Sequence, residues 1–244
     1  MGEVRRRGVF LTAEWVNIVM LNYAVEPGLL RGYVPVGTDL DAFDGMTYVS
    51  LVGFGFNGTR LAGVAIPFHS QFEEVNLRFY VRRGDRRGVV FLRELVPKRA
   101  VAAVARWVYG ENYSCVAMGQ TIEVAADGGL KAEYWWGAGT GSRSGRCAMR
   151  METSTPAFMP EEGSLSQFIT EHYWGYATQR DGGSLEYEVQ HPRWRVREAA
   201  RASFDGDAAQ YYGEEFAMVL MRPPDSAFMA EGSAVTVYKG TKIG

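Results

Sequence analysis

The pattern of polar and apolar residues predicts a chain built mostly of β-strands. Residues 72–82 alternate with a period of two, which is typical of a strand with one polar and one apolar face. One face carries Glu74, Asn76, Arg78 and Tyr80, and the other carries Val75, Leu77, Phe79 and Val81. Further β-type runs cover residues 16–25, 47–56 and 88–95. Glycines at 53 and 55 predict that the second of these runs is bent and lies against a close neighbour.

Turn residues separate these runs. Asp127-Gly128-Gly129 and Asp181-Gly182-Gly183 each lie between β-type segments and predict hairpins. Residues 137–146, with the sequence GAGTGSRSGR, predict a surface loop.

Helical patterns are fewer. Residues 97–109 give the clearest one, because apolar residues recur at helical spacing and Gly110 follows as a stop. A short helix is predicted over 27–33, another begins after the N-cap candidate Ser164, and a fourth covers 207–212.

Without a linker or a repeat, the pattern predicts one domain over residues 1–244, with residues 1–8 frayed. An α+β domain with a large curved sheet fits this order of elements.

The composition narrows the classes of partner. The formal net charge of −2 argues against nucleic acid. No run approaches the ~20 apolar residues that span a bilayer, and the N-terminus lacks the apolar core of a secretory signal. Cys115 and Cys147 are far apart and have no CxxC spacing, so we expect reduced thiols and a cytoplasmic location, with no membrane partner.

The sequence lacks the motifs of several common metal, nucleotide and catalytic sites. The three histidines, His69, His172 and His191, have no metal-ligand spacing, so no metal is expected. The chain has no GxGxxG after a strand, no GxxxxGK[ST] and no GxSxG, so neither a nucleotide cofactor nor a serine nucleophile of these types is expected. We therefore expect no cofactor.

Lys98 is the most informative single residue. It is one of four lysines beside 22 arginines, and only it lies between two apolar runs, directly after Pro97. Lys98 and Arg99 would place two cations in a first helical turn, where the helix dipole disfavours positive charge. The dipole and the guanidinium both favour a neutral amine, which is a nucleophile. The alternative is an ordinary solvated lysine.

Two other segments are dense in polar and aromatic residues. Glu171-His172-Tyr173-Trp174 follows a predicted helix and offers proton donors and acceptors. The second runs from Glu186 through Tyr187 to His191 and Trp194. Buried, hydrogen-bonded residues of these types are also common as plain structural elements, so a structural role remains the alternative for both segments.

These segments carry a resemblance to a known family. Residues 10–23 (FLTAEWVNIVMLNY), 43–54 (FDGMTYVSLVGF) and 72–83 (FEEVNLRFYVRR), together with ITEHYWGY and EYEVQHPRW, look like the YqjF-like family of uncharacterised bacterial proteins, also called domain of unknown function 2071. The resemblance runs from about Phe10 to about Tyr238. That family is regarded as a branch of the acetoacetate decarboxylase-like superfamily. The resemblance implies a curved, mostly antiparallel sheet that closes into a cone or barrel around a pocket, with a few flanking helices.

A weaker resemblance links the chain to acetoacetate decarboxylase itself. Arg93-Glu94-Leu95 followed by Pro97-Lys98-Arg99 looks like its active-site segment, which places Lys98 where that enzyme has its Schiff-base lysine. The same match puts Ala13, Ser50 and Leu61 where the enzyme has an arginine and two glutamates. The polar shell of the pocket is therefore missing or rebuilt here.

Three functions compete on this evidence. The first is a lyase, decarboxylase or aldolase that condenses Lys98 with a small oxo acid, with Arg99 beside it and Glu171 or His172 moving protons. The second is a binding protein that holds a small organic ligand without reaction, and the third is a proton-transfer enzyme that uses His172 and Glu171. The expected substrate-binding residues are Glu74, Asn76, Arg78, Arg93, Glu94, Tyr173, Trp174 and His191. A homo-oligomer is expected because relatives of this fold often assemble.

Overall fold

The computed structural model describes residues 8–65, 67–126, 128–137, 145–153 and 156–243, with only the backbone of 105–107 and 109. The frayed N-terminus predicted over 1–8 lies almost wholly outside the described residues. So do Asp127 of the first hairpin turn and residues 138–144 of the predicted surface loop.

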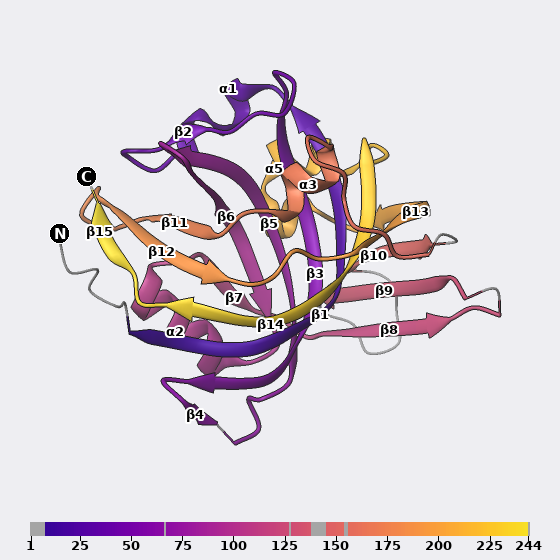
Figure 1. The fold of residues 1–244 in the computed structure, drawn as a ribbon, viewed down its shortest axis with the longest axis horizontal. Coiled ribbons are helices and arrows are strands. Elements are labelled where there is room, and N and C mark those ends of the chain that lie inside the picture. Colours follow the sequence, from indigo (N-terminus) through magenta and orange to yellow (C-terminus); the bar gives the residue numbers. More distant parts are fainter. Residues whose placement is uncertain (1–7, 66, 127, 138–144, 154–155, 244) are drawn as a thin grey trace.

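The described residues form one 15-stranded sheet with a few short helices (Figure 1). The strands are β1 (Val9–Val25), β2 (Asp39–Leu40), β3 (Thr47–Leu61), β4 (Val64–Ala65), β5 (Phe72–Arg83), β6 (Arg86–Val96), β7 (Tyr113–Cys115), β8 (Met118–Val124), β9 (Leu130–Gly137), β10 (Arg146–Thr153), β11 (Trp174–Thr178), β12 (Ser184–Gln190), β13 (Val196–Asp205), β14 (Ser226–Tyr238) and β15 (Thr241–Ile243). The helices are α1 (Pro27–Leu30), the 3-10 turn η1 (Arg31–Tyr33), α2 (Arg99–Tyr109), α3 (Leu165–Thr170), α4 (Ala209–Tyr212) and α5 (Glu214–Leu220).

The sheet turns back on itself. Its central strands follow the order β12-β11-β6-β5-β3-β1-β14, and β12 pairs again with β14. Of the pairings between these described strands, β6–β11 and β6–β7 are parallel and the others are antiparallel. Strands β8 and β9 extend away from this curved part, as Figure 1 shows. The α+β class and the curved, mostly antiparallel sheet predicted from the sequence are confirmed.

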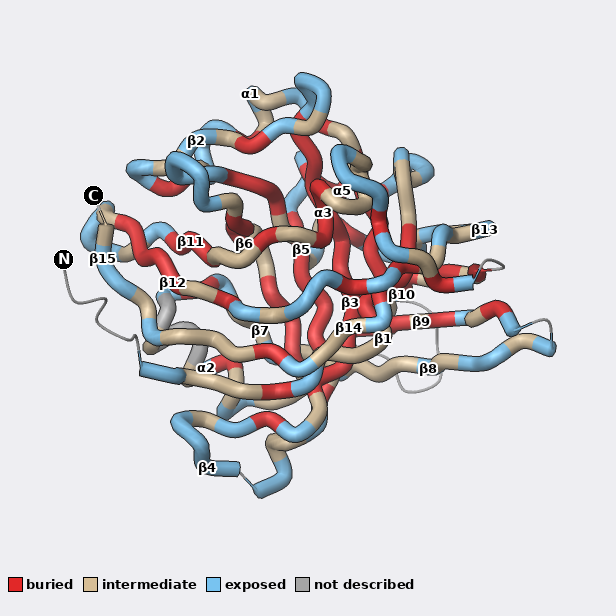
Figure 2. Tube along the Cα trace, viewed as in Figure 1, coloured by how far each residue is buried: buried red, intermediate tan, exposed pale blue. Residues whose placement is uncertain are grey.

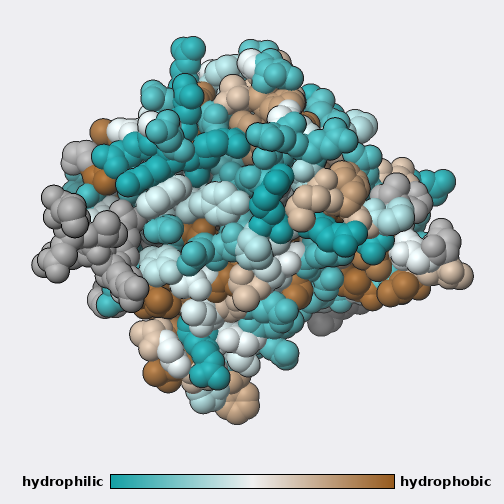
Figure 3. All heavy atoms as spheres, viewed as in Figure 1, coloured by the Kyte–Doolittle hydropathy of each residue, from teal (hydrophilic) through white to brown (hydrophobic). Residues whose placement is uncertain are grey.

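Buried residues lie along much of the central strands (Figure 2), and the apolar ones form two main clusters, one on each face of the sheet. On one face, Leu51, Leu77 and their neighbours pack against Tyr134 and Met149 of β9 and β10 and against α4 and α5. We call this cluster of residues the outer core. The second cluster, the inner core, occupies the other face and includes Met20, Val52, Phe54, Tyr80 and Trp194. By contrast, the surface seen in Figure 3 is mostly hydrophilic, with small separate hydrophobic patches.

The period-two pattern of β5 produces this division. Val75, Leu77, Phe79 and Val81 all lie in the outer core, whereas Tyr80 lies in the inner core. The predicted alternation is therefore confirmed. The close neighbour predicted at Gly53 is Tyr134, because a Cβ at residue 53 would lie 2.8 Å from the Tyr134 Cγ atom.

Several element boundaries differ from the prediction. Strand β1 begins at Val9 rather than residue 16, and its first half is less buried than its second. Helix α2 begins at Arg99, so Pro97 precedes the helix instead of opening it. Ser164 caps α3 as predicted, its hydroxyl accepting a hydrogen bond from the Gln167 backbone N–H at 3.2 Å. Helix α5 was not predicted. Among the described residues, no helix has both the length and the apolar character that crossing a bilayer requires.

Candidate functional site

The inner core surrounds a cavity of about 170 Å³. Its walls come from the connecting loops and from β1, β3, β5, β6, α2, β7, α3, β11, β12 and β14, so the curvature of the sheet creates it. Most of the lining is apolar or aromatic. Its aromatic members are Phe10, Trp15, Phe54, Phe56, Phe72, Phe91, Tyr113, Trp174, Tyr187 and Trp194. An apolar pocket with a few polar groups is the usual form of a small-molecule site.

Three buried glutamates form the polar wall of this cavity. Glu74 of β5 and Glu94 of β6 are each 2% exposed, and Glu111, just after α2, is 6% exposed. We call these three residues the carboxyl cluster. Glu74 and Glu94 lie on paired strands, where Asn76 is directly opposite Glu94. Glu111 follows Glu94 by 17 residues. The chain passes through α2 in this interval and then returns, so that Glu111 lies beside Glu74 and Glu94.

Hydrogen bonds join the carboxyl cluster into one network. Asn76 Nδ2 donates to Glu74 Oε1 at 3.0 Å, and the Tyr113 hydroxyl donates to Glu74 Oε2 at 3.0 Å and also bonds with Glu94. Glu94 and Glu111 bond to each other through their side chains. Such a carboxyl pair needs a proton between its oxygens, because two carboxylates have no donor.

Burial changes the acidity of these groups. Desolvation raises the pKa of Glu74 to about 7 and that of Glu111 to about 8. The pKa of Glu94 lies well above its ordinary value, first because of burial and then because of the charges of Glu111 and Glu74. The cluster therefore holds protons near neutral pH, and it can both donate and accept them.

A glycine in β11 makes room for one end of this network. Tyr187 of β12 lies opposite Gly175, and its hydroxyl donates to Glu111 Oε1 at 2.8 Å. A Cβ at residue 175 would lie 2.1 Å from the Tyr187 Cζ atom, so no side chain fits there. The tyrosine ring thus crosses over the glycine to reach the carboxyl cluster.

Five residues that line the cavity carry a buried polar atom without a hydrogen-bond partner among the described residues. These atoms are Trp15 Nε1, Thr59 Oγ1, Asn76 Oδ1, Arg78 Nε and Glu94 Oε2. The hydrogen bonds of Arg78 are long, at 3.4 Å from its Nη2 to the Ile169 carbonyl oxygen and at 3.9 Å to the Met20 sulfur, and its guanidinium lies 5.7 Å from the centre of the Tyr80 ring. Buried polar atoms without partners cost free energy, and they are therefore rare in native structures.

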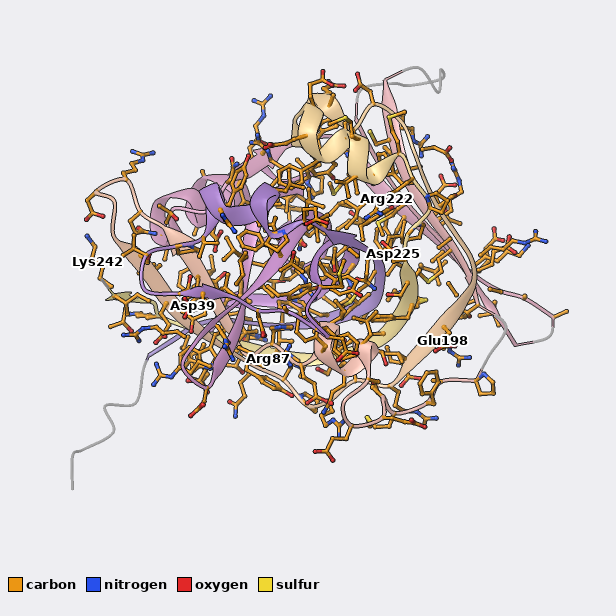
Figure 4. All side chains as sticks on the ribbon, turned by 90° about the horizontal axis from the view of Figure 1, so that it is seen from above. Asp39, Arg87, Glu198, Arg222, Asp225 and Lys242 are labelled. Atoms are coloured by element: carbon orange, nitrogen blue, oxygen red, sulfur yellow. The ribbon has the colours of Figure 1, made fainter. Side chains whose placement is uncertain are left out.

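His172 also lines the cavity, and both of its ring nitrogens have polar neighbours. Nδ1 is 3.4 Å from the Ile169 carbonyl oxygen, and Nε2 is 3.3 Å from Nη2 of Arg87. Arg87, labelled in Figure 4, also donates to Asp41 at 2.7 Å. Burial and the Arg87 charge lower the pKa of His172 well below its ordinary value. The pKa of His191 is lowered too, mainly by burial. These contacts favour a neutral His172 held in the wall.

The structure brings many of the predicted site residues together. Of the residues proposed for substrate binding or catalysis, those that line the cavity are Glu74, Asn76, Arg78, Glu94, His172, Trp174 and His191.

Five others are not among the described lining residues. Lys98 is half-buried and directly precedes α2, and Arg99 is exposed. Glu171 bonds with Arg193 at 2.5 Å, and Arg93 bonds with the Tyr211 carbonyl oxygen at 3.1 Å and with Asn112 at 2.8 Å. The ring of the fifth, Tyr173, packs on that of His191 with centroids 4.8 Å apart.

Sequence reasoning missed Glu111 and Tyr113 altogether. Both follow the α2 stop signal at Gly110, in a segment with no strand or helix period to show that it is buried. Tyr187 was named only as a member of a segment dense in polar and aromatic residues. Its position beside the cavity depends on Gly175 of the neighbouring strand, so the local sequence gave no signal for it. Within the described part of the chain, no three His, Cys, Asp or Glu residues are placed to hold a metal ion.

Comparisons with known proteins agree with this architecture. The DUF2071 family, described as an uncharacterised conserved protein, matches residues 12–234. The uncharacterised protein YqjF of Bacillus subtilis (strain 168) is 26% identical over 187 residues, which cover 76% of this chain and 74% of YqjF.

Solved structures share the fold. The enduracididine biosynthesis enzyme MppR complexed with pyruvate superposes with a TM-score of 0.68 at 14% identity, covering 100% of this chain and 94% of MppR. Acetoacetate decarboxylase from Legionella pneumophila subsp. pneumophila str. Philadelphia 1 gives a TM-score of 0.69 at 11% identity, covering 96% of this chain and 87% of that enzyme. At these identities the likeness concerns the fold.

Proposed function

Because the chain belongs to the DUF2071 family and has an acetoacetate decarboxylase-like fold, we propose that it binds a small organic molecule in the inner cavity. The observation that carries the proposal is an apolar cavity, partly open to solvent, with a cluster of buried, proton-holding carboxyl groups in its wall. A ligand with an apolar body and one polar end matches this division.

The size of the cavity limits the ligand. A cavity of about 150 Å³ in another protein is known to hold benzene, so a space of about 170 Å³ suits a body of similar size with a few further atoms. Burial of such a body supplies about 25 cal/mol for each Å² of apolar surface. The carboxyl cluster fixes the polar end and offers a general acid and a general base to any reaction there.

Native mass spectrometry and small-molecule extraction from the purified protein test this proposal. Val52→Phe narrows the cavity from β3, and Val124→Phe, on an exposed position of β8, is its matched control. We expect a ligand, or binding of small aromatic probes, that the wild type and Val124→Phe keep and that Val52→Phe loses. If all three proteins behave alike, the cavity is not the binding site.

A Schiff-base lyase is the second candidate. Lys98 directly precedes α2, and Ala100, Val101 and Val104 of that helix line the cavity. The MppR structure was solved with pyruvate, an oxo acid, in a protein of the same fold. Here the Lys98 amine would add to a ligand carbonyl and release water, and the resulting iminium would accept the electron pair of a breaking carbon–carbon bond.

Borohydride reduction in the presence of 2-oxo and 3-oxo acids tests the lyase. A covalent adduct that maps to Lys98, and that disappears in Lys98→Arg but not in Lys131→Arg, would support it. The absence of any adduct with the whole set of acids would overturn it and leave binding without covalent chemistry. Should Lys98→Arg keep a turnover that His172→Gln abolishes, the proton-transfer reaction at His172 and Glu171 would be favoured instead.

A further inference from the structure

The polar groups along β5 change charge from one inward position to the next. Glu74, Asn76 and Arg78 all line the cavity, so they present a carboxyl group, an amide and a guanidinium in that order. Alternate residues of a strand are about 6.6 Å apart. The acidic end at Glu74 and the basic end at Arg78 are therefore about 13 Å apart along the strand, and Asn76 lies between them, about 6.6 Å from each.

Among the atoms without partners, those of Asn76, Glu94 and Arg78 indicate what a ligand would supply. Asn76 Oδ1 is a hydrogen-bond acceptor, and so is Glu94 Oε2 when that group is ionised. These side chains are 1% and 2% exposed, so water on the outer surface does not reach them. Both oxygens therefore match a hydrogen-bond donor on the ligand. Arg78 Nε is a donor and calls for an acceptor, and none of the ion pairs of the described residues uses Arg78.

The charges of the groups around the cavity also indicate a ligand with a donor at one end and an acceptor at the other. The carboxyl cluster has no cation bonded to it among the described residues: its hydrogen-bond partners there are Asn76, Tyr113 and Tyr187. A bound ammonium group would supply the missing positive charge. A bound carboxylate would pair with the fixed cation of Arg78, for which guanidinium geometry is well suited.

From these complementary groups we propose that the ligand is a small zwitterion with an apolar body, such as an apolar amino acid, whose ammonium group binds Glu94 and Asn76 and whose carboxylate binds Arg78. This inference rests on the proposed binding function and adds the chemical class of the ligand. The aromatic walls around Phe54, Phe56 and Phe72 would hold the side chain of the ligand.

A set of compounds with one hydrocarbon body tests the inference on the wild-type protein. For the phenylalanine body these are phenylalanine, phenethylamine, 3-phenylpropanoate, 3-phenylpropanol and phenylpyruvate, and for the leucine body the five corresponding compounds. Titration calorimetry should show the amino acid binding at least tenfold more tightly than any other member of its set. Equal or tighter binding of the amine, the acid, the alcohol or the oxo acid would overturn the inference.

Proton release gives an independent measurement. An ammonium group beside the carboxyl cluster lets one carboxyl ionise, so its proton passes to the buffer while the charge of the ligand is unchanged. Titrations at pH 7 in buffers of different ionisation enthalpy should detect release of up to one proton with the amino acid and the amine, and none with the acid. No release with either nitrogen compound would contradict the assignment of the cluster to the ammonium group.

Two variants separate the ends of the ligand. Arg78→Met should weaken the amino acid and the acid by at least tenfold and leave the amine unchanged, and Glu94→Gln should weaken the amino acid and the amine and leave the acid unchanged. If both variants weaken all compounds equally, the two-ended recognition is wrong.

If the protein holds a ligand that Val52→Phe removes but binds no member of either set, the inference fails and the proposed function stands. If it holds no ligand at all, both fail.

Discussion

Two regions of this molecule bury glutamate side chains, and they treat the charge in opposite ways. Glu186 of β12 is 1% exposed and bonds with Arg86 at 2.6 Å, with Arg83 at 3.3 Å and with the Tyr176 hydroxyl at 3.2 Å. The carboxyl cluster is buried to the same degree, but its bonds come from tyrosines, an amide and its own members.

The difference separates a structural site from a candidate functional one. A buried carboxylate that two guanidinium groups compensate has no need of a further charge. A carboxyl group that the fold leaves without a cation keeps its proton instead, and such perturbed groups beside a cavity are typical of functional sites. The chain thus distinguishes two uses of the same residue by what is placed opposite it.

In both regions a glycine on the neighbouring strand makes room for a tyrosine ring. Tyr176 reaches Glu186 over Gly88, where a Cβ would lie 2.6 Å from the Tyr176 Cε2 atom. Tyr187 reaches Glu111 over Gly175 in the same way. In both cases the missing side chain on the neighbouring strand lets an aromatic ring cross the sheet and donate its hydroxyl proton to a buried carboxyl group.

Removing both cations from Glu186 should have the largest effect. Arg83→Met combined with Arg86→Met leaves the buried carboxylate without its two guanidinium partners, and we expect a loss of about 3 to 5 kcal/mol in the free energy of unfolding at pH 8. Urea denaturation measures it. Adding Glu186→Gln should restore most of the stability. A loss below 1 kcal/mol would remove the contrast between the two regions.

Filling the space beneath Tyr187 should come next. Gly175→Ala forces the ring off Glu111, and overpacking of this kind costs about 1 to 3 kcal/mol. The matched control is Gly28→Ala in α1, where a Cβ would meet no atom within 4 Å. Chemical denaturation of both variants compares them. Equal free energies of unfolding for Gly175→Ala and Gly28→Ala would show that the position of the Tyr187 ring does not depend on Gly175.

The pH dependence of stability should follow the carboxyl cluster. The folded pKa values of Glu74 and Glu111, about 7 and about 8, exceed the ordinary value, so the native state binds more protons than the unfolded state over that interval. Stability should therefore fall as the pH rises from about 5 to about 9. His172 and His191 have lowered pKa values and act in the opposite direction, because below about 6.5 the unfolded chain binds protons that the native histidines do not.

Glu111→Gln keeps a hydrogen-bonding group and removes the ionisation. We expect its melting temperature to change less than that of the wild type between pH 6 and pH 9, with a gain on the order of 1 to 2 kcal/mol at pH 9. Below pH 6 the two proteins should show the same histidine-dependent loss. An unchanged alkaline slope in Glu111→Gln would mean that this residue does not hold the proton.

Loss of the Glu171–Arg193 pair should have the smallest effect. The Arg193 side chain is 43% exposed, so solvent screens the pair, and Glu171→Gln should cost about 0.2 to 1 kcal/mol, less still in 0.5 M salt. Ligand binding should be unchanged. If Glu171→Gln keeps its stability but loses binding or turnover, the candidate site must be extended beyond the carboxyl cluster to Glu171.

The sequence allowed a good part of the site to be predicted because β5 and β6 are regular. The period of two in β5 put Glu74, Asn76 and Arg78 on one face, and the structure places that face toward the cavity. The same reasoning failed where contacts come from distant segments. Arg93 was expected in the pocket, but it lies opposite Leu77, which belongs to the outer core, and its guanidinium donates instead to Asn112 and to the Tyr211 carbonyl oxygen of α4.

By itself the sequence determined the fold class, most strands, the Ser164 cap and the family, because these depend on periodicity, on local hydrogen bonds and on motifs that neighbouring residues form. Only the tertiary structure decided which acids are buried without a cation. Glu94, Glu111 and Tyr187 lie far apart in the chain, and their shared proton exists because the curved sheet brings them together away from water. Burial and charge compensation are properties of the assembled sheet, so no local pattern distinguishes Glu111 from an ordinary surface glutamate.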